Sequence, residues 1–130
     1  MRFLSVYKTQ ETTTPPTPEY VDTMQRLVEE GVKAGWLLST EGCLPSSKGA
    51  RVKRAGGTTT VTDGPFTETK ELIAGFAILE ASSKEEAIEM ARRFVEVAGD
   101  GECELRQIFT PTDNEGGCVA AELAKQFAEI

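Results

Sequence analysis

The chain has 130 residues, of which 39% are apolar and 27% are charged, and this is the composition of a single folded globular domain. Its net charge of −7 argues against a protein that binds nucleic acid directly, because affinity for phosphates depends on clustered lysine and arginine. The sequence contains no histidine, so it lacks the residue that serves most often as general base and as metal ligand.

Several features bear on the cellular setting. No apolar run approaches the roughly 20 residues that cross a bilayer, so we expect no membrane association. The apolar stretch within Met1 to Lys8 is too short for a signal peptide. The three cysteines, Cys43, Cys103 and Cys118, are far apart and match neither a disulfide framework nor a zinc site. We therefore expect a cytoplasmic protein that holds no metal and no other cofactor.

The first part of the chain predicts a strand, a helix and a second strand. Arg2 to Lys8 alternates in polarity, as a strand does. Thr17 followed by Pro18 predicts a helix start, because the hydroxyl can cap the first turn and proline lacks an N–H that would be unpaired there. Apolar residues then recur at helical spacing as far as Gly35, which suits the end of a helix. Trp36 to Leu44 predicts the second strand.

A hairpin comes next. Arg51 to Ala55 and Thr58 to Thr62 flank Gly56-Gly57, and this pattern predicts two strands joined by a turn with positive φ. The basic cluster of the chain lies here, on Arg51, Lys53 and Arg54. Two interpretations of this cluster are open: it binds an anion, or it protects an exposed strand edge from pairing with other chains.

A tight corner and a buried strand follow. Asp63, Gly64 and Pro65 predict the corner, because aspartate can bond its own backbone and glycine accepts positive φ. After a polar connector, Leu72 to Leu79 is almost wholly apolar, which is typical of a central strand covered on both faces. Simple alternation places Phe76 and Ile78 on one face of this strand, and Ile73, Gly75, Ala77 and Leu79 on the other.

The rest of the domain predicts a helix and a last strand. Ser83 with Glu86 three residues later predicts a capping box that opens a helix over Lys84 to Ala98. Glu102 to Phe109 alternates and predicts the last strand. The element order is then strand, helix, strand, hairpin, strand, helix, strand. With right-handed crossovers this order gives an antiparallel sheet with two helices on one face.

We assign residues 1–110 to this domain and do not treat residues 111–130 as a separate one. Pro111 to Gly117 predicts a flexible connector, and Cys118 to Ile130 predicts a short helix with a narrow apolar line. Such a helix is too short to be a domain of its own. We expect it to pack on its own domain or on a partner chain, and the alternative is a frayed tail.

One stretch is long enough to compare with known families. It consists of Val61-Thr62-Asp63-Gly64-Pro65-Phe66-Thr67-Glu68-Thr69-Lys70-Glu71, followed by Gly75-Phe76 and an acidic, Ala-rich helix. Through it, and over about residues 1 to 110, the chain closely resembles the DGPF-type branch of the YCII-related family. The resemblance implies a bacterial protein with a ferredoxin-like α+β fold that pairs into a dimeric α/β barrel, often encoded beside extracytoplasmic-function sigma factors. It implies no settled activity.

The sheet itself also indicates a homodimer. The first strand and the strand from Leu72 to Leu79 are apolar on both faces, yet two helices cover one face only. The second face needs cover from elsewhere, and a second copy of the chain is the economical source. The family resemblance independently implies the same assembly.

Asp63 is the candidate catalytic residue. A carboxylate at the mouth of a cleft between the sheet and a partner can act as general base or hold a ligand. The alternative interpretation is structural, because aspartate before Gly-Pro can secure the corner by bonding its own backbone. Some YCII-related proteins are thought to pair histidine with aspartate in lyase-type chemistry, but this chain has no histidine, so that mechanism is not carried over.

Four further residues are candidate ligand-binding residues: Tyr7, Phe66, Lys70 and Arg106. Each also has a structural interpretation. Tyr7 and Arg106 lie on strands expected to face the dimer interior, but Tyr7 can be an interface residue and Arg106 an ion-pair partner of Glu104 or Glu41. Phe66 can be a core plug, and Lys70 a solvated surface charge.

Two functions from different classes agree with these observations. The first is a dimeric small-molecule-binding or accessory protein, linked to sigma-factor regulation as the genomic setting of the family suggests. The alternative is a small lyase-type or other acid/base enzyme that uses Asp63 in a cleft. The missing histidine favours the first.

Overall fold

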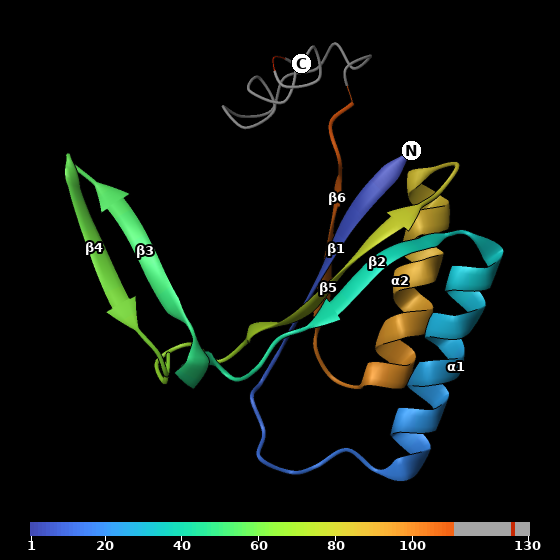
Figure 1. Cartoon of the computed structure of the whole chain (residues 1–130), viewed down its shortest axis with the longest axis horizontal. Coiled ribbons are helices and arrows are strands. Elements are labelled where there is room, and N and C mark those ends of the chain that lie inside the picture. The colour runs from blue at the N-terminus through green and yellow to red at the C-terminus, as the bar shows by residue number, and fades with distance from the viewer. Residues whose placement is uncertain (111–125, 127–130) are drawn as a thin grey trace.

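The computed structural model of the protein describes residues 1–110 and 126. A four-stranded antiparallel sheet carries two helices on one face, and a two-stranded arm stands apart on the other side (Figure 1). Residues 111–125 and 127–130, where the linker and C-terminal helix were predicted, lie outside the described residues. The elements in chain order are β1 (Arg2–Thr9), α1 (Pro18–Ala34), β2 (Leu37–Gly42), the 3-10 turn η1 (Ser46–Lys48), β3 (Ala50–Ala55), β4 (Thr58–Asp63), β5 (Leu72–Glu80), α2 (Lys84–Ala98) and β6 (Glu102–Gln107).

The main sheet has the strand order β2-β5-β1-β6, so β1 and β5 are central, as their apolar sequences predicted. One detail of the alternation was wrong. The register shifts between Tyr7 and Lys8, and Lys8 pairs with Ile73. A bulge of this kind adds one residue to a strand and inverts the facing of those beyond it. Ile73 therefore shares the face of Phe76 and not that of Leu79.

Both helices begin at the predicted caps. The Thr17 hydroxyl accepts a hydrogen bond from the N–H of Tyr20 at 3.1 Å, and the Ser83 hydroxyl accepts one from the N–H of Glu86 at 3.1 Å. The predicted capping box is only half formed. The Glu86 carboxylate accepts from the N–H of Ser82 at 3.2 Å instead of from Ser83. The negative charge still lies at the positive end of the helix dipole, where it is favourable.

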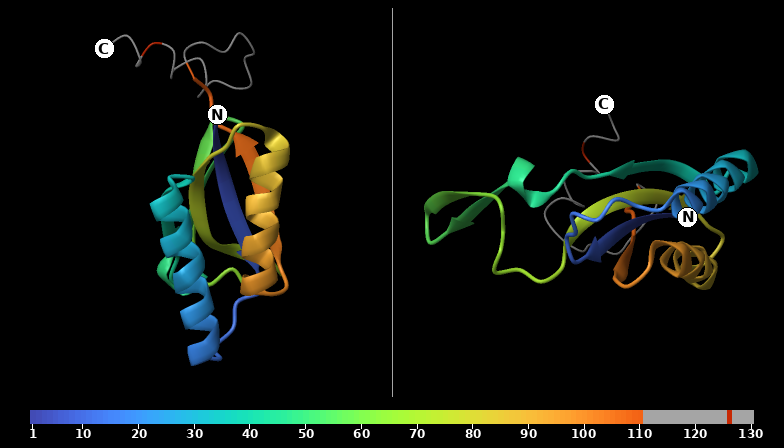
Figure 2. Two further views of the ribbon diagram at one scale, coloured as in Figure 1. Left: turned by 90° about the vertical axis from the view of Figure 1, so that its right-hand side faces the viewer. Right: turned by 90° about the horizontal axis from the view of Figure 1, so that it is seen from below.

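The helices lie side by side on the sheet (Figure 2), and the tightest packing is at one end of this layer. A cluster of buried residues joins the sheet to α2 there, and its members are Phe3, Leu37, Leu79, Ala81 and Ala87. An ion pair between Arg93 of α2 and Glu30 of α1, at 2.7 Å, joins the two helices to each other. Toward the other end of the sheet the side chains no longer fill the space between the layers.

The arm is a ribbon formed by β3 and β4, and it lies on the side of the sheet opposite the helices (Figures 1 and 2). Gly56 and Gly57 form its turn with φ of 56° and 80°, which confirms the predicted positive φ. Every residue of both strands is exposed. The ribbon thus contributes nothing to the core of its own chain.

The corner after the arm depends on Gly64 and not on Asp63. A Cβ atom at Gly64 would lie 1.7 Å from the carbonyl oxygen of Ser46, so only glycine fits. The Gly64 N–H donates to the carbonyl of Gly49 at 3.0 Å. Among the described residues the Asp63 carboxylate has no hydrogen-bond or ion-pair partner, so its predicted bond to the turn backbone is wrong. Close approach of two backbones fixes this corner.

We therefore expect Gly64→Ala to lower the free energy of unfolding by about 2–4 kcal/mol, because the rigid Ser46 backbone must move. Gly42→Ala is the matched control, since a Cβ there meets nothing within 4 Å. Asp63→Ala should change stability by no more than about 0.5 kcal/mol, as exposed substitutions do. Urea unfolding measures all three, and a Gly64→Ala protein as stable as the wild type would show the corner to be adaptable.

Candidate functional site

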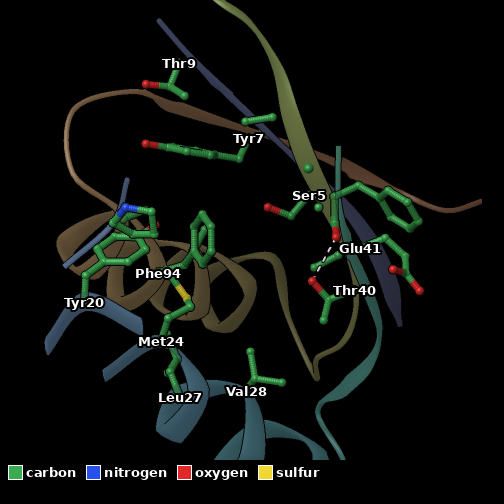
Figure 3. A pocket seen from close by; sticks show the side chains of 18 of the residues that line it. Ser5, Tyr7, Thr9, Tyr20, Met24, Leu27, Val28, Thr40, Glu41 and Phe94 are labelled. Atoms are coloured by element: carbon green, nitrogen blue, oxygen red, sulfur yellow. Dashed lines mark hydrogen bonds between the residues drawn. The ribbon is translucent and has the colours of Figure 1, made fainter. Parts of the chain in front are cut away.

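A cavity of about 730 Å³ lies between the sheet and the two helices (Figure 3). Strands β1, β2 and β5 form its floor, α1 and α2 form its roof, and the segment before α1 closes one side. Cavities that hold small organic molecules in proteins are roughly 300–1,000 Å³. Its size therefore suits a ligand of that class.

The cavity exists because the residues around it are small where the layers face each other. On the sheet side, β5 contributes Ala74, Gly75 and Ala77. On the helix side, α2 contributes Ala91 and Ala98. The side chains of these five residues are too small to fill the space between the sheet and the helices.

Aromatic and sulfur-containing side chains line much of the remaining wall, and these are Tyr7, Tyr20, Trp36, Phe94, Met24 and Met90. The rings of Tyr7 and Phe94 meet edge to face, with centroids 5.1 Å apart and planes at 81°. Rings that are held in this way present fixed apolar surfaces, against which a flat or branched apolar molecule can pack. Methionine side chains adapt to irregular shapes.

Tyr7 is held in place by the turn between α2 and β6. Its hydroxyl donates to the carbonyl oxygens of Gly99 and Asp100 at 3.3 and 3.2 Å. The Thr9 hydroxyl donates to the same Asp100 carbonyl at 2.8 Å. A Cβ atom at Gly101 would lie 2.7 Å from the Tyr7 hydroxyl, so glycine leaves the room that the ring needs. The position of Tyr7 is thus set by backbone on one side and by Phe94 on the other.

The polar groups of the cavity are mostly uncharged. The Thr40 hydroxyl donates to the carbonyl of Phe76 at 3.0 Å, and Ser5 is buried in the floor. Of the described residues that line the cavity, Glu41 is the only one with a charge, and Figure 3 shows its carboxylate turned away from the aromatic wall. Burial raises the pKa of the Tyr20 hydroxyl, and the nearby Tyr7 raises it further. This environment favours neutral groups.

Of the residues predicted for the site, Tyr7 alone lines the cavity. Asp63 is exposed at the end of β4, and Lys70 is exposed in the connector before β5. Phe66 is 9% exposed, and the guanidinium of Arg51 lies 3.8 Å above its ring. Phe66 therefore acts as the core plug of the arm's base. These residues belong to the arm and its corner.

The structure separates Tyr7 from Arg106, which were expected to face the same interior. Tyr7 lies opposite Cys103 and Arg106 lies opposite Leu4, so their side chains project from opposite faces of the sheet. Arg106 is on the face without helices, where its guanidinium is 3.8 Å from the Glu104 carboxylate. The ion-pair interpretation of Arg106 is the one that the structure supports.

Sequence reasoning missed most of the wall. Tyr20 and Met24 are among the apolar residues whose helical spacing predicted the first helix, so a signal existed. That spacing does not distinguish packing against the sheet from lining a cavity. Trp36 is placed by Gly31, because a Cβ atom there would lie 2.9 Å from the indole ring. No local pattern could have indicated that contact.

Two other kinds of feature bear on function in the described part of the chain. Neither of its helices has the length and apolar character that a membrane span requires. Its cysteine, aspartate and glutamate side chains form no group of three or more placed to hold a metal ion.

The fold defines a small α+β domain with a cavity between its two layers. Residues 1–111 match the YCII-related domain, and the chain therefore belongs to the family of proteins that carry this domain. An uncharacterized protein of Rhizobium meliloti (strain 1021) is 39% identical over 61 residues, which are 47% of this chain and 49% of the relative. The chain thus spans about half the length of the curated relative that it matches.

The environment of Tyr20 predicts a dependence of stability on alkaline pH. The folded chain keeps the Tyr20 proton to higher pH than the unfolded chain does, because burial raises the pKa of this hydroxyl. The stability that this hydroxyl contributes is fully present below its pKa in the unfolded chain, which is about 10. It is lost as the pH rises through the pKa of the hydroxyl in the folded chain. We expect the unfolding free energy of Tyr20→Phe to fall less steeply above about pH 10 than that of the wild type. Urea unfolding from pH 7 to 11 measures this, and identical slopes would contradict it.

Proposed function

We propose that the protein binds a small, uncharged and mostly apolar molecule in the cavity between its sheet and helices. The observation that carries this proposal is the cavity of about 730 Å³ itself, lined by aromatic rings and hydroxyl groups. A space of this size in a folded domain costs stability, because the atoms around it lose their packing contacts. A ligand would recover those contacts.

The lining indicates the chemistry of the ligand. Tyr7, Trp36 and Phe94 offer apolar ring surfaces, and Tyr20 and Thr40 offer hydroxyls for one or two hydrogen bonds. A phosphate or carboxylate group would need a cationic partner to offset its loss of water. The described lining contains neither lysine nor arginine, so it favours a neutral molecule.

The enzyme hypothesis is the weaker one. Its acid/base residue, Asp63, lies in the exposed part of the chain and does not line the cavity. The motif from Asp63 to Phe66 supports placing the chain in the DGPF-type branch of the family. Within that motif, Gly64 and Phe66 have clear structural roles at the base of the arm.

Binding can be tested with the neutral fluorescent probe N-phenyl-1-naphthylamine. Trp36 is the single tryptophan of the chain and lies on the cavity wall, so a probe bound in the cavity is close enough to receive energy transfer from it, and the cavity variants locate the probe. We expect Ala91→Leu or Ala98→Leu to weaken probe binding by about tenfold, because a larger side chain takes the ligand's place. Val21→Leu is the control, as Val21 is 47% exposed on α1 and lies outside the cavity. Binding without energy transfer, or unchanged by both cavity variants, would contradict the proposal.

We also propose that the protein is a homodimer in which a second copy covers the open face of the sheet. We use the name open face for the side without helices, which carries Leu4, Val6, Ile73, Phe76 and Ile78. Ile73 is 58% exposed in the single chain, and the other four are half-buried. The Lys8–Glu104 ion pair, at 3.0 Å, lies at the rim. An apolar centre with a charged rim is the usual composition of a protein interface. Two such sheets facing each other would form the ferredoxin-like, dimeric α/β barrel that the family resemblance implies.

Sedimentation velocity at micromolar concentration tests the dimer. We expect the wild type to sediment as a dimer and Ile73→Arg to shift it toward monomer, because a buried arginine in that interface would lose its water without a partner. Val32→Arg is a matched control, since Val32 on α1 and Ile73 are both 58% exposed. A wild type that is monomeric would contradict the proposal, as would equal behaviour of the two variants.

A further inference from the structure

The arm is uncovered in the single chain. All residues of β3 and β4 are exposed, and Val52 and Val61 are 71% and 65% exposed. A ribbon of two strands without a hydrophobic partner is only marginally stable in water. A persistent ribbon of this kind therefore requires an outside surface to pack on.

The base of the arm is nonetheless firmly attached. Arg51 stacks on Phe66 at 3.8 Å and donates to Glu68 and Thr69 at 3.0 and 3.1 Å. The N–H of Phe66 donates to the Ser46 hydroxyl at 3.2 Å. These contacts fix the direction in which the ribbon leaves the domain, so the arm has a defined orientation relative to the sheet. They also assign Arg51 of the basic cluster to an internal role.

The two faces of the ribbon differ in chemistry. Val52 lies directly opposite Val61, which makes an exposed apolar pair that we call the valine face. Lys53 lies opposite Thr60 on the other face, which is polar. Directly opposed β-branched side chains on one face are a favourable surface for packing. The valine face is thus the side of the ribbon that gains most from a partner.

Charge and position indicate which partner fits. With Arg51 paired to Glu68, the ribbon keeps two basic residues, Lys53 and Arg54, against one acidic residue, Asp63, whereas the whole chain has a net charge of −7. The rest of the chain is therefore still more acidic than the total, and it attracts a basic arm from another copy. The arm also projects on the open-face side of the sheet (Figures 1 and 2), where a second copy would sit.

We propose that the arm of each chain lies along the second copy of the dimer and contacts it through the valine face. This inference rests on the dimer proposed above. It adds a second interface, which is formed by the arm and is separate from the open face of the sheet. The arm then gains the cover that it lacks in its own chain, and the exchange is reciprocal in a twofold dimer.

The contribution to affinity can be measured with matched pairs of substitutions. Val52→Ser with Val61→Ser removes the valine face, and Lys53→Ser with Thr60→Ser changes the opposite face of the same ribbon at paired positions. We expect the first pair to raise the dimer Kd by about tenfold or more, since burial of two valines is lost, and the second by less than about threefold. Sedimentation across a concentration series gives both values. Equal effects of the two pairs would overturn the inference.

Cross-linking locates the contact. The three cysteines of the chain are first changed to serine. Benzophenone-maleimide is then attached at Val61→Cys or, as a control, at Thr60→Cys. Dimers that mix unlabelled and ¹⁵N-labelled chains are irradiated, so that cross-links between chains can be told from cross-links within one chain. We expect cross-links between chains from position 61 and few from position 60. Cross-links only within one chain would overturn the arm contact. So would duplex DNA binding at low salt that Lys53→Ser with Thr60→Ser abolishes, because the arm's partner would then be nucleic acid.

The outcomes for the arm and for the dimer are distinguishable. If the wild type is a dimer that Ile73→Arg dissociates while the valine-face pair leaves Kd unchanged, the sheet interface stands and the arm contact is wrong. If the wild type is monomeric, the dimer itself is wrong and the arm inference fails with it. Both measurements leave the cavity proposal untouched, because Ile73, Val52 and Val61 do not line the cavity.

Discussion

Two helices cover one face of a sheet whose central strands are apolar on both, and this imbalance governs the rest of the structure. The helices approach the sheet closely at one end, where Phe3 and Leu79 pack against Ala87. At the other end, small residues of β5 and α2 leave a cavity. The uncovered face of the sheet and the cavity under the helices thus have the same cause, which is the limited cover that the two helices give. The two helices of the described residues have too few large side chains to fill the covered face, and they do not reach the other face.

Close contacts at glycines also shape the structure. A glycine lets another segment approach where a Cβ atom would collide with it. Gly64 lies against the backbone of Ser46, Gly101 gives Tyr7 its place, and Gly31 lies beneath Trp36. Each of these contacts determines where a larger element goes: the arm, the end wall of the cavity and the start of β2. Glycine costs chain entropy on folding, but at these positions a Cβ atom would collide with the neighbouring atoms.

The fate of the basic cluster shows how one sequence feature can divide into separate roles. Arg51 is drawn into the base of the arm by the Phe66 ring and the Glu68 carboxylate. Arg54 bonds across the ribbon to Thr59 at 3.0 Å, and Lys53 faces the other side. Neither of the two interpretations open from the sequence, an anion site or edge protection, describes Arg51. Its pairing required Phe66 and Glu68 to fold back over the arm.

The sequence by itself determined the elements and their order. Among residues 1–110, alternation, caps and the Gly56-Gly57 turn located the six strands and the two α-helices to within about two residues, because these signals are local. The family match and the one-sided helix cover were likewise accessible. Only the tertiary structure decided which face Tyr7 joins and that Asp63 lies outside the cavity. It also decided that Ile73 turns outward, because one bulge inverts the alternation beyond it. These are properties of register and of the distance between layers, which depend on contacts between residues far apart in the chain.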